Sequence, residues 1–301
     1  VCGAPRGVAF DAASGLLHVA CATGELVSLP AAGGGLTRRL LLGTDLRDVI
    51  VQGSHLLVSR LKKAELLELS ETGAEVRREA PPEFTGVVFP PEAQQQTLHT
   101  PATVAWRTVG LPTGGAAVVH TRGVSDPIDT RRGGYGNGPC KGSIVNSTVS
   151  VLDGKNHMAA GPMIQVALPV DLAVSADGSK FAIADASRVG VTAGLPAVFT
   201  GPLAAVGHDC TFPATLNVTG QATAVAFDGQ GRVLTQTREP AALFVEGAPT
   251  PIALSGVSRR DEGHELFHGA TRAMLACASC HPEGGDDAST VADAALLMAD
   301  R

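Results

Sequence analysis

The chain has 301 residues, of which 44% are hydrophobic and 17% charged, and its formal net charge is -6 at pH 7. This composition indicates a globular protein and argues against a disordered one, and the lack of Lys/Arg runs argues against a nucleic-acid partner. No apolar stretch approaches the roughly 20 residues that a membrane-spanning helix needs, so we expect no transmembrane segment in this chain.

Residues 1–257 form a succession of short β segments separated by turn residues. Segments 8–10, 16–20 and 25–29, with tight turns between them, are typical of an antiparallel meander. The same order of segments and turns then recurs. Clear copies begin near residues 48, 171 and 224, and weaker ones near residues 103 and 143.

Repeats of about 40 to 50 residues, each equivalent to a four-stranded sheet, predict an all-β fold of the β-propeller type. The reason is that each sheet can bury its apolar face only against the next sheet. At this period we expect about six or seven blades, or an incomplete ring, and a β-sandwich is the alternative. Segments 81–101 and 123–139 are rich in Pro, Gln and Gly. We expect them to be long inter-blade loops, which would suit a docking surface.

Helical periodicity replaces strand periodicity near residues 255–260. Asp261 is placed to cap a helix that continues to Cys277, and Ser289 to cap a second short helix. The apolar face expected for the first helix consists of Gly263, Leu266, Phe267, Ala270 and Met274. We therefore predict two regions, a propeller domain at 1–257 and the beginning of a helical domain at 258–301.

The strongest chemical signal is Cys277-Ala278-Ser279-Cys280-His281. Two cysteines two residues apart, followed at once by histidine, are the attachment signature of c-type haem. The thiols add to the two vinyl groups of one porphyrin, and the histidine becomes the proximal iron ligand. A zinc site would need a second Cys or His pair, and a redox pair would follow a strand in a thioredoxin-like pattern. These patterns are missing, and a disulfide is the remaining alternative, so we predict covalent haem c at Cys277 and Cys280 with His281 on the iron.

The distal haem ligand is less well defined. Met298 is the only methionine after the motif and is a candidate, with apolar packing as the alternative. His264 and His268 precede the motif and are weaker candidates, with solvent-facing helical positions as the alternative. Because only 20 residues follow His281, we expect the chain to be a fragment or a truncated product.

Four further cysteines, Cys2, Cys21, Cys140 and Cys210, allow three disulfide connectivities. We favour Cys2–Cys21, which brackets one strand–turn–strand unit, and Cys140–Cys210, which would join two turn-rich segments. Inert buried thiols are the alternative. Haem is attached covalently outside the cytoplasm, where disulfides also persist.

The C-terminal part of the chain resembles a known family in two strings. They are Asp261-x-Gly263-His264-Glu265-Leu266-Phe267-His268 and Cys277-x-x-Cys280-His281-Pro282-Glu283-Gly284-x-Asp286-Asp287. Together they resemble the first haem-binding segment of bacterial di-haem cytochrome c peroxidases and MauG-like proteins, and in particular the relatives in which a β-propeller precedes the cytochrome domain. Segments 5–10 and 46–49 add to the resemblance within the propeller.

The resemblance implies a periplasmic or cell-surface haem protein that exchanges electrons with a redox partner protein or a small donor or acceptor. For the full-length protein it also implies a haem-dependent, peroxidase-like oxidoreductase. This chain departs from the family in having one Cys-x-x-Cys-His instead of two. The alternative function is a propeller binding or scaffold module with a haem-less cytochrome remnant. A propeller hydrolase is a weaker alternative, because no pattern gathers its metal ligands.

Overall fold

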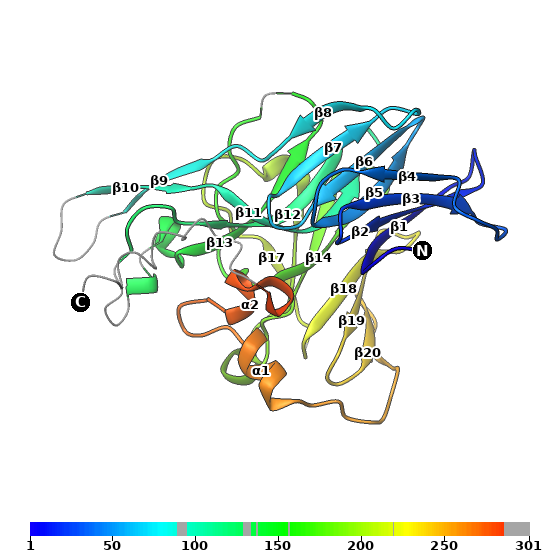
Figure 1. Cartoon of the computed structure of the whole chain (residues 1–301). Coiled ribbons are helices and arrows are strands. Elements are labelled where there is room, and N and C mark those ends of the chain that lie inside the picture. Colours follow the sequence, from blue (N-terminus) through cyan, green and yellow to red (C-terminus); the bar gives the residue numbers. More distant parts are fainter. Residues whose placement is uncertain (89–94, 129–133, 137, 156, 219, 286–301) are drawn as a thin grey trace.

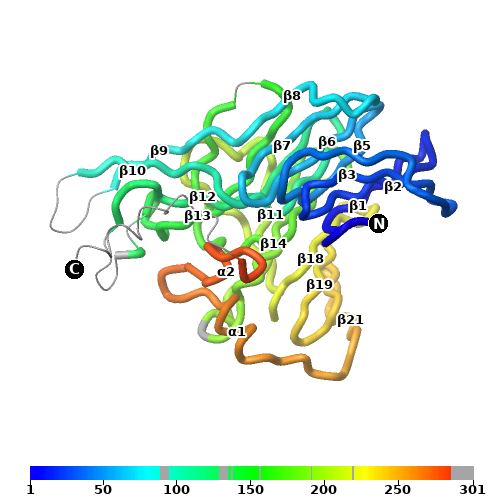
Figure 2. The backbone as a smooth tube through the Cα atoms, viewed as in Figure 1, coloured from blue at the N-terminus to red at the C-terminus, as the bar shows by residue number. Residues whose placement is uncertain are grey.

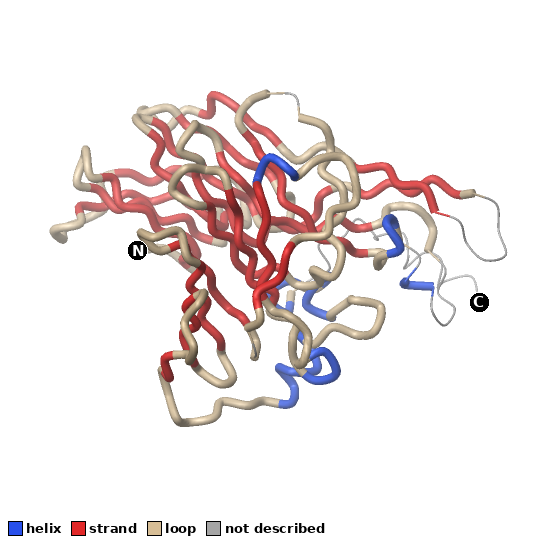
Figure 3. Tube along the Cα trace, turned by 180° about the vertical axis from the view of Figure 1, so that it is seen from behind, coloured by secondary structure: helices blue, strands red, loops and turns tan. Residues whose placement is uncertain are grey.

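The computed structural model describes residues 1–88, 95–128, 134–136, 138–155, 157–218 and 220–285. Within these residues the strands form four sheets of four strands, one of three and one of two (Figure 1). In each of the first five sheets, strands consecutive in sequence lie side by side and antiparallel, as the repeats predict. We call these five sheets blades one to five. Strands are the main secondary structure among the described residues, and the helices are short (Figure 3).

In chain order, the strands and helices have the following bounds. Blade one contains β1 (Pro5–Asp11), β2 (Leu16–Cys21), β3 (Glu25–Pro30) and β4 (Arg38–Leu41). Blade two contains β5 (Leu46–Gln52), β6 (His55–Arg60), β7 (Glu65–Leu69) and β8 (Glu75–Glu79), and the two-stranded sheet is β9 (Phe84–Val88) with β10 (Gln96–Thr100). Blade three contains β11 (Ala102–Gly110), β12 (Ala116–Gly123) and β13 (Val145–Leu152). Blade four contains β14 (Pro169–Val174), β15 (Lys180–Asp185), β16 (Val198–Pro202) and β17 (Ala214–Leu216). Blade five contains β18 (Ala222–Phe227), β19 (Val233–Thr237), β20 (Ala242–Val245) and β21 (Ile252–Ala253), and the helices are α1 (Glu262–His268) and α2 (Cys277–Cys280).

The first strand of each blade is the innermost one. These strands are neighbours in the order β1, β5, β11, β14 and β18. Between successive blades lie clusters of buried apolar side chains. Examples are Leu26 with Leu46 between blades one and two, Leu66 with Val118 between two and three, Val119 with Phe181 between three and four, and Val198 with Val225 between four and five. Because each sheet buries its apolar face against the next, this arrangement confirms the predicted β-propeller.

In the part of the chain that the structure describes, there are five blades and a hairpin, whereas the repeat period predicts about six or seven blades. The weak repeats near residues 103 and 143 belong to one sheet, because β12 pairs with β11 on one side and with β13 on the other. The segment after residue 81, expected to be a loop, instead contributes the β9–β10 hairpin. Sequence alone could not show this, since both arrangements use short apolar segments at similar spacing.

The first strand of blade one has an open face. On β1, Ala9 packs into the cluster shared with blade two. Val8 and Phe10 point the other way and are 65% and 57% exposed. Successive side chains of a strand point to opposite faces, so the face of β1 turned away from blade two is left largely in solvent.

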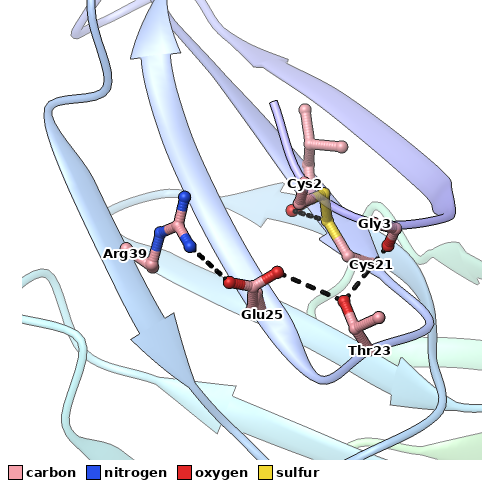
Figure 4. The surroundings of a disulfide bond; sticks show 7 residues. Cys2, Gly3, Cys21, Thr23, Glu25 and Arg39 are labelled. Carbon is pink, nitrogen blue, oxygen red and sulfur yellow. Dashed lines mark hydrogen bonds and ion pairs between the residues drawn. A yellow bond between two sulfur atoms is a disulfide. The ribbon is translucent and has the colours of Figure 1, made fainter.

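Both disulfides that the sequence favours are formed. Cys2 bonds to Cys21 and ties the N-terminus to the end of β2 (Figure 4). Beside it, the Thr23 hydroxyl donates to the Gly3 carbonyl at 3.1 Å. Cys140 bonds to Cys210 and joins blade three to the segment before β17. Cys2–Cys21 reinforces the β1–β2 pairing, in which Pro5 lies opposite Cys21, whereas Cys140–Cys210 joins two segments outside the strands.

The C-terminal segment leaves blade five after β21 and turns back toward the propeller (Figure 2). Asp261 caps α1 as predicted, because its carboxylate accepts from the His264 N–H at 2.7 Å. The prediction that this helix continues to Cys277 is wrong. α1 ends at His268, and the Ala270 N–H donates to Ser187 of the propeller at 3.1 Å. Leu266, expected on the apolar face, is 79% exposed.

The helix expected after Ser289 lies outside the described residues, and the predicted domain boundary at residue 257 stays a prediction. In the part of the chain that the structure describes, no helix is both long and apolar enough to cross a membrane.

Candidate haem-attachment site

Helix α2 is a single turn that presents the predicted haem anchors. The His281 N–H donates to the Cys277 carbonyl at 3.0 Å and closes the turn. Cys277 is exposed and Cys280 is half-buried. Residues three apart lie on the same side of a helix, so the two thiols share one side of α2. The structure thus brings the two cysteines and His281 together within one turn and its end.

The opposite side of this turn packs against the propeller. Ala278 and Ser279, the two residues between the cysteines, are each 2% exposed. Ala278 joins the apolar cluster that also contains Leu61 and Leu168, and the Ser279 hydroxyl donates to the Ala167 carbonyl at 2.9 Å. The propeller therefore supports the turn from the side away from Cys277.

Glu283 connects the end of the turn to two blades. One carboxylate oxygen accepts from Arg47 at 2.7 Å and the other accepts from Arg6. Both arginines lie in a β-bulge at the start of an inner strand, and the inner strands of all five blades contain such a bulge. A bulge bends the strand and redirects its side chains. The two bulges point Arg6 and Arg47 toward the same carboxylate.

One ring nitrogen of His281 has a backbone partner. Its Nδ1 lies 3.3 Å from the Gly285 carbonyl oxygen. A carbonyl can only accept a hydrogen bond, so Nδ1 is the donor in this contact, and in the neutral ring the lone pair is then on Nε2. Metal-ligating histidines commonly donate from the other ring nitrogen to a carbonyl, which sets the tautomer and the ring orientation. The donor set of two thiols and one such imidazole fits the chemistry of haem c.

A chain of ion pairs joins blades two, three and four. Arg107 lies 2.9 Å from an Asp48 oxygen and 3.2 Å from an Asp171 oxygen. Burial raises the pKa of both aspartates above the ordinary value. The second oxygen of Asp48 accepts from the Thr108 N–H at 2.8 Å, and that of Asp171 from the Val225 N–H at 2.9 Å. Each aspartate thus binds the inner strand of the following blade, so these charges join blades.

The cavity beside Arg272–Met274 is small, and none of the residues from Cys277 to His281 lines it. A cavity of about 180 Å³ lies between Arg272–Met274 and the loop before β13. Ligand pockets usually measure roughly 300–1,000 Å³. Among the described residues, no group of three or more His, Cys, Asp or Glu side chains is placed to hold a metal ion. The described chain supplies the attachment turn and its support, without an enclosed haem pocket.

The candidate distal ligands are placed as follows. His264 and His268 stack with ring centroids 3.9 Å apart. His264 Nε2 is 3.0 Å from the Gln221 amide oxygen, and His268 Nδ1 is 2.9 Å from the His264 carbonyl oxygen. Burial, followed by the neighbouring His268, lowers the pKa of His264 below its ordinary value. Both rings are thus tied to α1 and blade five, and Met298 lies outside the described residues. The distal ligand stays a prediction.

Sequence reasoning missed the pairing of Glu283 with Arg6 and Arg47. The available signal was the repeat itself, because each arginine comes just before the apolar part of a first strand, as Arg6-Gly7-Val8 and Arg47-Asp48-Val49. Residues at equivalent places in neighbouring blades lie side by side in a propeller. That rule could have brought the two arginines together, but not Glu283 to them.

No protein-family model matches this chain, and no curated protein matches it. Among solved structures, the chain is similar to the β-propeller domain of Cps50 (Swd1) from Myceliophteria thermophila. The two are 12% identical, the match covers 88% of this chain and 74% of that one, and the TM-score is 0.44. A likeness at this identity concerns the fold alone and says nothing about what the chain does.

Proposed function

We propose that this chain carries covalent haem c and transfers electrons outside the cytoplasm. The observation that carries the proposal is the α2 turn. It presents Cys277 to solvent and holds His281 with its proton on Nδ1, while its other side is buried on the propeller. A haem bound there supplies one-electron redox chemistry.

In this proposal each residue has a distinct role. Cys277 and Cys280 are the thioether anchors, and Nε2 of His281 is the proximal ligand. Ser279 and Ala278 hold the turn against the propeller, so the anchors keep their orientation. The two disulfides favour an oxidising compartment, such as the periplasm or the cell surface, where haem c is also attached. The partner is a redox protein or a small electron donor or acceptor.

The second candidate is a scaffold or binding module. The β-propeller fold is consistent with it, and the open face of blade one around Val8 and Phe10 is the specific observation that favours it. In that case the α2 turn would remain as a remnant that holds no haem. The two candidate functions share the same fold and differ in whether a haem is attached at α2.

A spectrum separates the two functions. The protein is produced in a host that matures c-type cytochromes, alongside Cys277→Ala, His281→Ala and, as a matched control, His99→Ala on the β9–β10 hairpin, where the side chain is exposed. We expect a Soret band and a pyridine haemochrome spectrum from the unsubstituted protein and from the control. Cys277→Ala should lose one thioether, which shifts the pyridine haemochrome band. His281→Ala should lose the proximal ligand, which shifts the Soret band. A colourless unsubstituted protein would refute haem attachment and leave the scaffold function.

Peroxide reduction is a further step of the same proposal, and it rests on the family resemblance alone. The haem-loaded protein should consume hydrogen peroxide in the presence of a reduced donor, and the His281→Ala protein should not. If the loaded protein transfers electrons but leaves peroxide untouched, the activity is electron transfer without peroxidase chemistry.

A further inference from the structure

We propose that Arg6 and Arg47 are positioning residues that orient the His281 imidazole by holding Glu283 between them. This inference rests on the haem attachment proposed above and adds residues from blades one and two to that site. We call Arg6, Arg47 and Glu283 the clamp.

The clamp is preorganised from the propeller side. Arg6 also donates to an Asp45 oxygen at 2.7 Å, and Arg47 also donates from Nε to the Trp106 carbonyl at 3.2 Å. The two side chains are mostly buried, at 16% and 25% exposure. An arginine whose planar group is already held loses less freedom when it binds a carboxylate. The propeller therefore presents two fixed donors, and Glu283 fits between them.

The chain around Glu283 adopts a conformation that the clamp helps to maintain. Glu283 has φ +58° and Gly284 has φ +69°. A non-glycine residue in this left-handed region is uncommon and persists where its surroundings determine it. Both oxygens of Glu283 are used, one by each arginine. Together with the backbone hydrogen bonds from Gly284 to His281 and from Gly285 to Pro282, the clamp can offset the cost of this backbone conformation.

The conformation at Glu283 in turn sets the hydrogen bond of His281. The turn Pro282–Gly284 leads directly to Gly285, whose carbonyl oxygen receives the His281 Nδ1 proton. A stronger hydrogen bond at Nδ1 makes the imidazole a better electron donor, and this is one of the means by which a protein sets a haem potential. Releasing the clamp should weaken this bond and raise the reduction potential.

The test compares Arg47→Gln with Glu283→Gln in the haem-loaded protein. If the clamp acts through His281, both substitutions raise the midpoint potential. If the residues act only as nearby charges, the shifts are opposite, because loss of a positive charge lowers the potential and loss of a negative charge raises it. Arg39→Gln is the matched control, since Arg39 pairs with Glu25 at the exposed edge of blade one; it should leave the potential unchanged.

A second readout needs no haem. In the apo protein, amide hydrogen exchange at residues 276–285 should become faster in both clamp variants, with exchange in the strands unchanged. Opposite potential shifts, midpoint potentials unchanged from that of the unsubstituted protein, or unchanged amide exchange would each overturn the clamp. If the unsubstituted protein takes up no haem, the proposed function fails, and the exchange measurement still decides whether the clamp orders the turn.

Discussion

The propeller and the C-terminal segment of residues 261–285 are held in place by different kinds of contact. At every junction between described blades the propeller buries apolar side chains from both sheets. The C-terminal segment contributes mainly Ala278, Ser279 and Phe267 to the interface, with the Glu283 ion pairs beside them. The comparison teaches that the segment is held by a few apolar contacts together with polar ones, while the blades are held to one another mainly by buried apolar side chains.

The largest expected effect is a cavity inside the propeller. Phe181 on β15 is 1% exposed and packs between blades three and four. Phe181→Ala should lower the free energy of unfolding by about 3–5 kcal/mol, because it removes buried surface and leaves a void. Leu266→Ala on exposed α1 is the control and should stay within about 0.5 kcal/mol. Chemical denaturation measures both, and equal losses would contradict the asymmetry between the two regions.

A substitution below the attachment turn should affect both regions. The buried Asp185 carboxylate accepts from the N–H groups of Ala167, Leu168 and Ser187, and it pairs with Arg188 at 3.2 Å. Asp185→Ala leaves a buried arginine uncompensated, which should cost about 3–5 kcal/mol in unfolding free energy.

The same substitution should also speed amide exchange in α2, because Ala167 carries the carbonyl that binds Ser279. Asp11→Ala, in an exposed hairpin turn of blade one, is its control. Unchanged exchange in α2 after Asp185→Ala would show that the segment is held independently of this part of blade four.

The two disulfides should differ in their contribution to stability. Cys140–Cys210 closes a sequence separation of 70 and Cys2–Cys21 one of 19. In the chain-entropy description, removing a disulfide costs about 2–4 kcal/mol, and the longer loop should cost about 1 kcal/mol more. Thermal unfolding measures the difference in stability between two double variants, Cys140→Ser/Cys210→Ser and Cys2→Ser/Cys21→Ser. A larger loss from the shorter loop would show that native contacts outweigh loop length.

The smallest expected effect is a dependence of propeller stability on pH through His120. Burial, with Arg122 nearby, lowers the pKa of His120 well below 6.5. The unfolded chain therefore binds a proton below about pH 6.5 that the folded protein does not. Stability should be fully present above that pH and fall on acidification, by up to about 1.4 kcal/mol per pH unit. His120→Gln should make the unfolding free energy less dependent on pH, as measured by denaturation between pH 7 and pH 5. An unchanged pH dependence would show that other titrating groups cause it.

Much of the architecture was readable from the chain because it depends on local pattern. Turn residues between short apolar segments mark the strands, and their recurrence indicates blades. The cap at Asp261 was predictable because capping involves residues three apart. The end of α1 at His268 was not, since Ala270 bonds to Ser187 of blade four instead of continuing the helix. A non-local partner decided that boundary.

By itself the sequence determined the propeller repeat and the spacing of Cys277, Cys280 and His281, because both are set by neighbours along the chain. Only the tertiary structure decided which sheets the weak repeats join, and where the turn with those three residues rests. It also brought Arg6 and Arg47 to Glu283. The physical reason is that strand bulges and blade packing set the direction of a side chain relative to residues far away in sequence, and local periodicity holds no information about that direction.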